Sequence, residues 1–350
     1  MATTRQSNME LLRVITMFGI LLLHANYFCF GYPKFQLVNS HILTYPGRYF
    51  LEYLCISAVD VFVMISGWFG IRARLNGALR LLYQILFCGV AVGLFMIARG
   101  QLTSSFGRIF QNACGMWFVW SYLMLYILSP ALNAFIEKAS EREVRNFLWA
   151  MLAMELFDKL SNLSLFFSGF SPLHFVFIYV LARYIRLYLA PRWQQVSTHR
   201  FVIAFFGLTL LMVSLQWLAG FVGSIKFYTH CTHYFTIYTN PLCIAQAAML
   251  ILIFSRLKIQ NRTINYLASA ALAVYLLHQN PYVRQEYCDI FRTLHATYPI
   301  ALALVLDFVA ICCVYLVAVG VDTLRQISWR WIENLYYRLL PKKESTESSH

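Results

Sequence analysis

Arg13 and His24 lie in the first apolar stretch of the chain, MELLRVITMFGILLLHANYF at residues 9–28. A charged or titratable side chain inside a membrane span is energetically costly and usually marks a functional site. An arginine can bind an anion through its planar guanidinium, and an imidazole can act as a general base or a nucleophile. The two residues are eleven positions apart, which is about three helical turns, or ~16 Å along the axis. We therefore expect both side chains on one helix face, with an anion site at one end and a base deep in the bilayer.

The composition places this helix in a membrane protein. The chain of 350 residues is 60% hydrophobic and only 12% charged, with a mean hydropathy of +0.60, whereas a soluble domain is about 25% charged. The net charge of +13 comes from basic residues scattered among loops between apolar stretches. The preference of Lys and Arg for cytoplasmic loops explains this charge better than nucleic-acid binding does, so we predict no nucleic-acid partner.

About ten apolar stretches have the length of a membrane span. They cover residues 9–30, 49–70, 79–98, 114–136, 147–168, 172–190, 201–222, 238–255, 264–282 and 299–321. Most Lys and Arg residues fall on the side of the N-terminus, which predicts both termini in the cytoplasm. The predicted fold is an all-α, polytopic transmembrane helical bundle, with one membrane domain at 1–335. A polar cytoplasmic tail at 336–350 is expected to be disordered.

Several further polar residues in the first two spans are candidates for a site, each with a simpler structural alternative. Glu10 lies one turn before Arg13, which could itself be a topological anchor at the headgroups. Asp60 could orient or charge-balance a histidine, or it could face water at the interface. Ser66 could serve a substrate, although with Gly67 it forms a small-residue pair that favours close helix packing.

Later segments add a second group of candidates. Trp117 could form an aromatic wall for a ligand, or belong to the interfacial aromatic belt. His278 and Asn280 precede a proline at the end of a span, which suits a polar cavity as well as a helix cap. Arg72 and Arg74 could hold an anionic ligand, although membrane topology also explains them.

Metal chemistry is not predicted. His230 and His233 have a spacing of three, but their loop at 226–240 holds no Asp or Glu, so a metal site is disfavoured. The nine cysteines show no metal-type spacing and most fall within predicted spans. We therefore expect small buried side chains and no disulfide framework.

Four segments together resemble the acyltransferase-3 family of bacterial integral membrane acyltransferases. Arg13, the ten residues VITMFGILLL and His24 match the family's Arg, ten residues, His signature. The stretches VFVMISGWF, MWFVWSYLMLY and AVYLLHQNP resemble its Ser-Gly, Trp-aromatic and tyrosine-leucine-x-histidine elements. The resemblance covers about residues 5 to 335. It is closest to stand-alone members that O-acetylate envelope polysaccharides or enterobacterial common antigen.

The resemblance implies an enzyme that transfers an acyl group, most often acetyl from acetyl-CoA, to a sugar hydroxyl. On this hypothesis the CoA phosphates bind at the cytoplasmic mouth near Arg13, helped by Arg72 and Arg74. His24 then acts as a general base or carries the acyl group, and both routes remain open. Asp60, His278 and Asn280 are the expected acceptor-binding residues, with Glu10, Ser66 and Trp117 as further substrate contacts.

The expected surroundings follow from the same hypothesis. The location is the bacterial cytoplasmic membrane, and the partners are acetyl-CoA, a glycan or lipid-linked sugar and the bilayer, with no tightly bound cofactor. A homo-oligomer is left open. A transporter or exporter with an intramembrane proton relay is the main alternative, although no internal repeat typical of such folds is apparent. A purely structural protein would not need Arg13 and His24 on one face.

Overall fold

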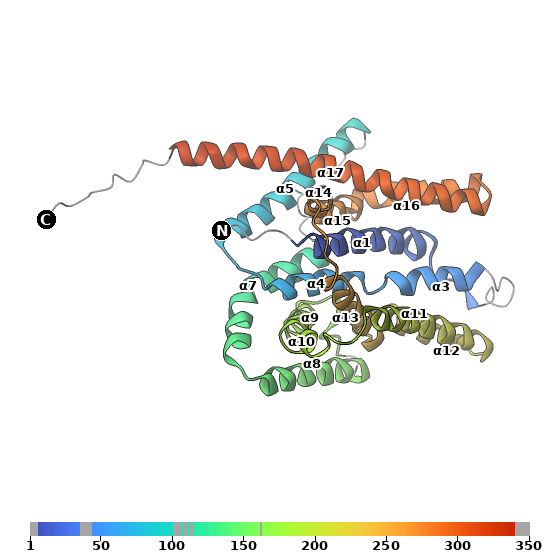
Figure 1. The fold of residues 1–350 in the computed structure, drawn as a ribbon. Coiled ribbons are helices and arrows are strands. Elements are labelled where there is room, and N and C mark those ends of the chain that lie inside the picture. Colours follow the sequence, from blue (N-terminus) through green and yellow to red (C-terminus); the bar gives the residue numbers. More distant parts are fainter. Residues whose placement is uncertain are drawn as a thin grey trace.

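The computed structural model describes residues 6–35, 44–100, 107, 111, 115–161 and 163–339, and all regular secondary structure in these ranges is helical (Figure 1). The α-helices are α1 Ser7–Leu23, α3 Thr44–Cys55, α4 Ala58–Phe69, α5 Leu75–Ala98, α7 Trp117–Lys138, α8 Glu141–Ser161, α9 Pro172–Tyr184, α10 Ala190–Arg192, α11 Thr198–Phe221, α12 Ile225–Phe235, α13 Pro241–Ser255, α14 Arg262–Ser269, α15 Ala271–His278, α16 Pro281–Thr297 and α17 Ile300–Leu339. Short π-helical segments, η1 His24–Phe28 and η3 Ile185–Leu189, extend α1 and α9, and η2 Phe167–Gly169 is a 3₁₀ turn.

Seven helical segments among the described residues are long and apolar enough to cross a membrane. They are Ser7–Phe28, Gly47–Phe69, Leu75–Ala98, Trp117–Lys138, Pro172–Arg192, Thr198–Phe221 and Ile300–Tyr336. Each coincides with one of the predicted spans to within a few residues, except that the last helix is much longer. The all-α, multi-pass membrane fold is thus confirmed, whereas the total number of crossings stays a prediction.

The other three predicted spans have a different form from the one expected. The span at 147–168 ends early because α8 stops at Ser161 and the chain turns back. There the carboxylate of Asp158 accepts the backbone N–H groups of Leu165 (2.7 Å) and Phe166 (3.1 Å). The span at 238–255 is the 15-residue α13, which is shorter than the other membrane helices.

The predicted span at 264–282 is divided among α14, α15 and the start of α16. Proline lacks a backbone N–H and is favoured at the first position of a helix, and here α15 ends at His278 and α16 begins at Pro281. Between them, the Asn280 side chain accepts the backbone N–H of Tyr282 at 3.1 Å and caps the new helix. The prediction of a continuous span at 264–282 was therefore wrong, and the break leaves polar side chains at the junction between α15 and α16.

The start of α1 and the end of α17 lie on one side of the molecule. Helix α1 starts and α17 finishes at the left of Figure 1, which agrees with termini on the same side of a bilayer. Helix α17 reaches Leu339, so residues 336–339 of the predicted tail are helical. The rest of that tail, 340–350, lies outside the described residues. The assignment of this side to the cytoplasm stays a prediction.

Helix α4 lies at the centre of the bundle, where it packs against α1, α9 and α13. Its residues Val61, Val63, Met64 and Ile65 are fully buried. A Cβ atom on Gly67 would lie 2.5 Å from the carbonyl oxygen of Tyr179 on α9. The absence of a side chain therefore permits this approach, and the packing role predicted for the small residue Gly67 is confirmed.

A π-helical segment follows the α-helical part of the first span. Regular α-helix runs from Ser7 to Leu23, and the wider π turn begins at His24. Such segments are inserted locally into α-helices, frequently at functional sites. Because the α-helical spacing is maintained up to Leu23, Arg13 and His24 keep the shared face that the sequence predicted.

Candidate active site

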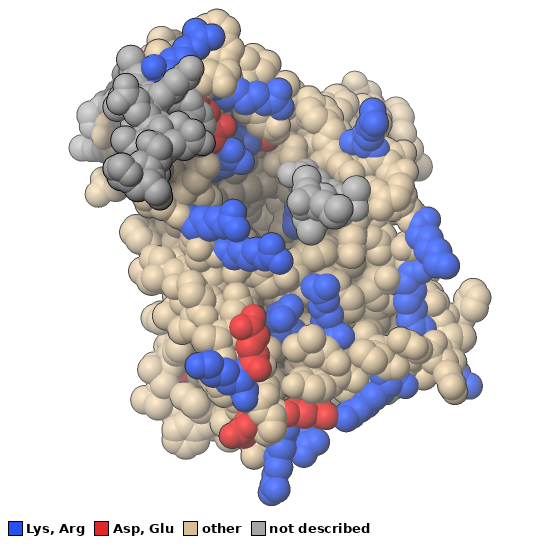
Figure 2. Space-filling view, turned by 60° about the vertical axis from the view of Figure 1, so that its left-hand side comes forward, with Lys and Arg blue, Asp and Glu red and all other residues tan. Residues whose placement is uncertain are grey.

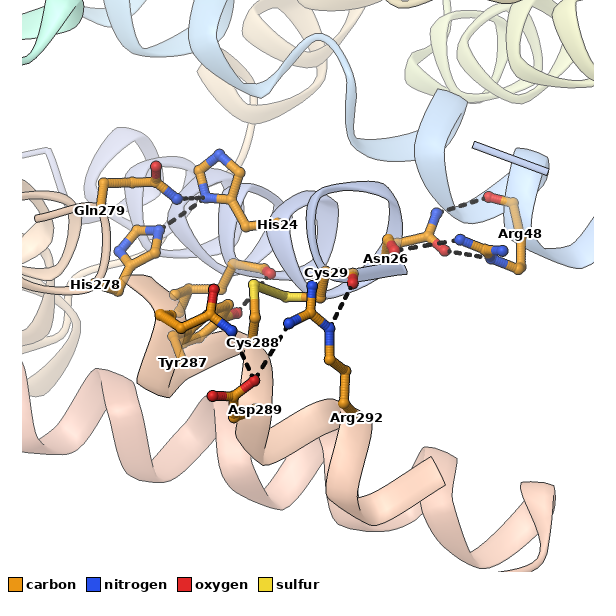
Figure 3. Close-up of a disulfide and its surroundings, with 12 residues drawn as sticks. His24, Asn26, Cys29, Arg48, His278, Gln279, Tyr287, Cys288, Asp289 and Arg292 are labelled. Atoms are coloured by element: carbon orange, nitrogen blue, oxygen red, sulfur yellow. Dashed lines mark hydrogen bonds and ion pairs between the residues drawn. A yellow bond between two sulfur atoms is a disulfide. The ribbon is translucent and has the colours of Figure 1, made fainter. Parts of the chain in front are cut away.

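His24, at the start of η1, contacts His278 at the end of α15, as Figure 3 shows. Its Nδ1 atom lies 2.8 Å from Nε2 of His278 and 2.7 Å from the side-chain amide of Gln279. His278 is buried and its own Nδ1 lies 2.6 Å from the carbonyl oxygen of Val274. The broken helix between α15 and α16 thus presents two consecutive polar side chains to the first span.

The hydrogen-bond partners determine which nitrogen of each imidazole carries the proton. A carbonyl oxygen only accepts, so Nδ1 of His278 must donate to Val274, and Nε2 of a neutral His278 is then an acceptor. His24 therefore donates from Nδ1. The Gln279 amide can also accept from Nδ1 through its oxygen after a half-turn of the amide. The remaining nitrogen, Nε2 of His24, keeps its lone pair, as a general base or nucleophile requires.

Helix α16 is fastened to the helix that carries His24. Cys29, just after the π segment, forms a disulfide with Cys288 of α16 (Figure 3). The Tyr287 hydroxyl donates to the carbonyl of Leu21 at 2.7 Å, and Arg292 donates to the carbonyl of Cys29 at 2.9 Å. The expectation that the cysteines form no disulfide framework was wrong for this pair, because the two residues are 259 positions apart and only the fold brings them together.

Arg13 and His24 both line one large cavity. It has a volume of about 1050 Å³, and Arg13, His24, Ser66 and Trp117 are among the residues that line it. This volume is at the upper end of the ~300–1,000 Å³ typical of small-molecule pockets. Arg13 and His24 thus face the same cavity, as their spacing predicted.

The end of the cavity near Arg13 is strongly basic. Arg80 of α5 and Arg325 and Arg330 of α17 line it together with Arg13. Figure 2 shows a hollow with Lys and Arg side chains around it on the side of the molecule where α1 starts and α17 ends. Clustered guanidinium groups bind phosphate oxygens through charge-assisted, often bidentate, hydrogen bonds.

Three of these arginines have an acidic neighbour that sets their position. Arg13 pairs with Glu10 at 2.8 Å, Arg80 with Glu333 at 2.6 Å, and Arg325 with Asp322 at 2.6 Å. Glu10 therefore holds Arg13, and it is not among the lining residues.

Arg72 and Arg74, predicted to help with the anion, occupy a different place. Both are exposed in the connection between α4 and α5 and do not line the cavity. The backbone of Arg74 exchanges hydrogen bonds with the hydroxyl of Tyr126, at 2.9 Å in each direction. Arg80, one turn into α5, has the position that the sequence analysis gave to them.

Asp60 contacts a histidine, as predicted, but the histidine is His174 of α9 and not His24. Nε2 of His174 lies 3.0 Å from Asp60, and its Nδ1 lies 2.6 Å from Glu155 of α8. The thiol of Cys243 donates to Asp60 at 3.7 Å. All four side chains are buried, and none of them lines the cavity. This group links four helices.

Of the remaining predicted residues, two line the cavity and two do not. The Ser66 hydroxyl lies 3.2 Å from that of Tyr122 at the cavity wall. Trp117 packs edge-on to Phe170, with ring centroids 4.7 Å apart. His278 and Asn280 do not line the cavity. Asn280 caps α16, and its Nδ2 atom is buried without a hydrogen-bond partner.

Several charged residues that line the cavity were not among the predicted site residues, namely Glu52, Arg80, Arg284, Arg325, Arg330 and Glu333. Glu52 is buried in the cavity wall. A signal was available, because Glu52 follows Arg48 at one helical turn within an apolar stretch, which is unusual for a membrane helix.

A multi-pass helical bundle around a large cavity, with arginines at one end and an oriented histidine inside, defines a membrane protein with the features of an enzyme. A family model described as an acyltransferase domain, that of the acyltransferase-3 family, matches residues 6–331. The chain therefore belongs to this family and is a membrane acyltransferase. No curated protein and no solved structure matches it. The family assignment favours the enzyme over the transporter that the buried charges alone left open.

Proposed function

We propose that the protein transfers an acetyl group from cytoplasmic acetyl-CoA to a sugar hydroxyl of an envelope polysaccharide or lipid-linked glycan, in the bacterial cytoplasmic membrane. The observation that carries the proposal is the single cavity shared by Arg13 and His24. A donor with several phosphates and a reactive thioester at the end of a long arm suits a cavity that is basic at one end and holds a base ~16 Å further along the helix.

The donor would bind with its phosphates at the basic end. Arg13, Arg80, Arg325 and Arg330 come from three different helices and converge on this region, so they can surround a polyanion. Trp329 and Tyr126 also line the cavity and offer aromatic surface beside the cationic groups. The pantetheine arm would then extend toward His24 between α1, α4 and α5.

His24 would supply the acid–base chemistry. Its free Nε2 takes the proton from the acceptor hydroxyl while that oxygen attacks the thioester carbonyl. The C–S bond then breaks, and the imidazolium returns the proton to the departing thiolate, so the products are the acetyl ester and free CoA thiol. His278 keeps the imidazole in the required tautomer. In the other open route, the same Nε2 atom first accepts the acetyl group.

The test is acetyl transfer from labelled acetyl-CoA by membranes that contain His24→Ala, Arg13→Ala or the control Arg72→Ala, with equal protein amounts. We expect a fall of about 100-fold or more for His24→Ala, the contribution typical of a general base. Arg13→Ala should raise the KM for acetyl-CoA, and Arg72→Ala should behave as the parent protein. Near-normal activity of the His24 variant would remove this mechanism.

A further inference from the structure

The carboxylate of Glu52 lies in the cavity wall on α3 and is held by the helix that bears His24. Asn26, two residues after His24, donates from Nδ2 to Glu52 at 3.1 Å. The same amide group donates to the carbonyl of Arg48 at 3.0 Å and accepts from Arg48 Nε at 3.1 Å. Figure 3 shows Asn26 and Arg48 on the side of His24 away from His278 and Gln279.

Glu52 has no ion-pair partner within the described ranges. Arg48 is the nearby cation, but its guanidinium donates to Asn26 and to the carbonyl of Gly31 (2.7 Å). A carboxylate in a membrane interior without a paired cation is costly and is retained where it has a function. Because Glu52 lines the cavity, its oxygens are available to a ligand that can donate hydrogen bonds.

Aromatic side chains line the cavity beside Glu52 and elsewhere on its wall. Tyr27 and Tyr32 lie edge to face, with ring centroids 4.5 Å apart, and both line the cavity beside Glu52. Trp117 and Tyr238 are stacked at 6.0 Å on another part of the wall. Flat apolar rings combined with one carboxylate suit a sugar, which has apolar C–H faces and hydroxyl donors at its edge.

We propose that Glu52 binds the acceptor: it accepts hydrogen bonds from hydroxyls of a hexose unit and so directs a neighbouring hydroxyl toward Nε2 of His24. The aromatic residues pack against the faces of the sugar ring. This inference rests on the proposed function for the donor half of the reaction. Glu52 thus takes the role in the acceptor subsite that was predicted for Asp60, because Asp60 is paired with His174.

The experiment uses the full chain in nanodiscs, with acetyl-CoA as donor and a panel of p-nitrophenyl hexosides as acceptors. It compares the parent protein with Glu52→Gln, Glu52→Asp and the control Glu286→Gln, which removes an acidic group of α16 that pairs with Arg99 outside the cavity. Acetyl-CoA affinity is titrated separately, acetylated hexosides are measured by mass spectrometry, and thermal unfolding checks the fold of each variant.

We expect Glu52→Gln to keep the acetyl-CoA affinity within about twofold, and to raise the KM for the hexoside about tenfold or more, since one charge-assisted hydrogen bond is lost. Glu52→Asp should recover part of this loss, and Glu286→Gln should match the parent. Equal hexoside KM values for Glu52→Gln and the parent would overturn the inference. So would a parent protein that binds acetyl-CoA but acetylates no hexoside. A parent protein that does not bind acetyl-CoA would instead overturn the proposed function.

Discussion

Nδ1 of His24 and Nε2 of His278 lie 2.8 Å apart, although the two residues are 254 positions apart in the chain. The carbonyl of Val274 fixes the proton on the other nitrogen of His278, so the pair has one consistent arrangement of protons. His278 therefore acts on His24 as a carboxylate acts on the histidine of a hydrolase: it accepts a hydrogen bond from Nδ1–H and leaves Nε2 free.

This relationship predicts the effect of changing His278. His278→Phe removes the acceptor for His24, and the loss of one hydrogen bond at the base should lower kcat about tenfold or more, with the KM for acetyl-CoA unchanged. His278→Gln, which can still accept through its oxygen, should recover part of the rate. A steady-state analysis of both variants in membranes checks this, and a selective rise in KM would contradict a positioning role.

The basic end of the cavity predicts which arginines bind the donor. Arg80→Ala or Arg330→Ala should weaken acetyl-CoA binding about tenfold or more, because a hydrogen bond to a charged group contributes ~1.5–3 kcal/mol. Arg74→Ala, outside the cavity, is the matched control and should have no effect. Titration at two salt concentrations is the measurement, since the arginine contribution should shrink as salt rises. Equal affinities for all three variants would place the donor elsewhere.

The disulfide predicts a dependence of activity on oxidation. Cys29→Ser, or a reductant that reaches Cys29–Cys288, releases α16 from the helix that bears His24, so both activity and thermal stability should fall. The loss of a native disulfide commonly costs ~2–5 kcal/mol. Cys313→Ser is the control, because this cysteine is free and exposed on α17. If reductant lowers activity equally in the parent and in the Cys29→Ser, Cys288→Ser double variant, the effect arises from another group.

The buried group around His174 should matter for stability and not for chemistry. His174→Ala leaves Asp60 and Glu155 buried without their shared partner, and breaking such a buried pair costs ~3–5 kcal/mol. We expect a marked fall in unfolding temperature, while the folded fraction still binds acetyl-CoA with the parent affinity. Unfolding in detergent and an acetyl-CoA titration together test this. A variant with normal stability and lost activity would make the group part of the active site.

Gly67 offers a test of helix packing. Gly67→Ala places a methyl group 2.5 Å from the Tyr179 carbonyl oxygen and 2.8 Å from Cβ of Ala182, so α4 and α9 must separate. Overpacking of this kind costs ~1–3 kcal/mol, and thermal unfolding should show it. Gly207→Ala, on α11 with no atom within 4 Å of the added Cβ, should be neutral or slightly stabilising. Equal unfolding temperatures for the two variants would mean that the helices repack freely.

The sequence by itself determined the membrane fold, the family and the shared face of Arg13 and His24. Hydropathy and helical periodicity are local properties of a chain. Because the segment between Arg13 and His24 is a regular α-helix, the periodicity alone places both side chains on one face. The same local reasoning identified the polar end of the span at His278, because a histidine and an asparagine before a proline stand out in an apolar segment.

Only the tertiary structure decided which polar residues meet. Asp60 and His278 were both assigned to acceptor binding, yet Asp60 belongs to His174 and His278 supports His24. Arg80 and Arg325 took the place given to Arg72 and Arg74, and Cys29 joined Cys288. In each case the partners lie on different helices, and their contact depends on how those helices rotate and pack against one another. The sequence shows which residues share a face of each helix, whereas the packing of all the helices decides which faces come into contact.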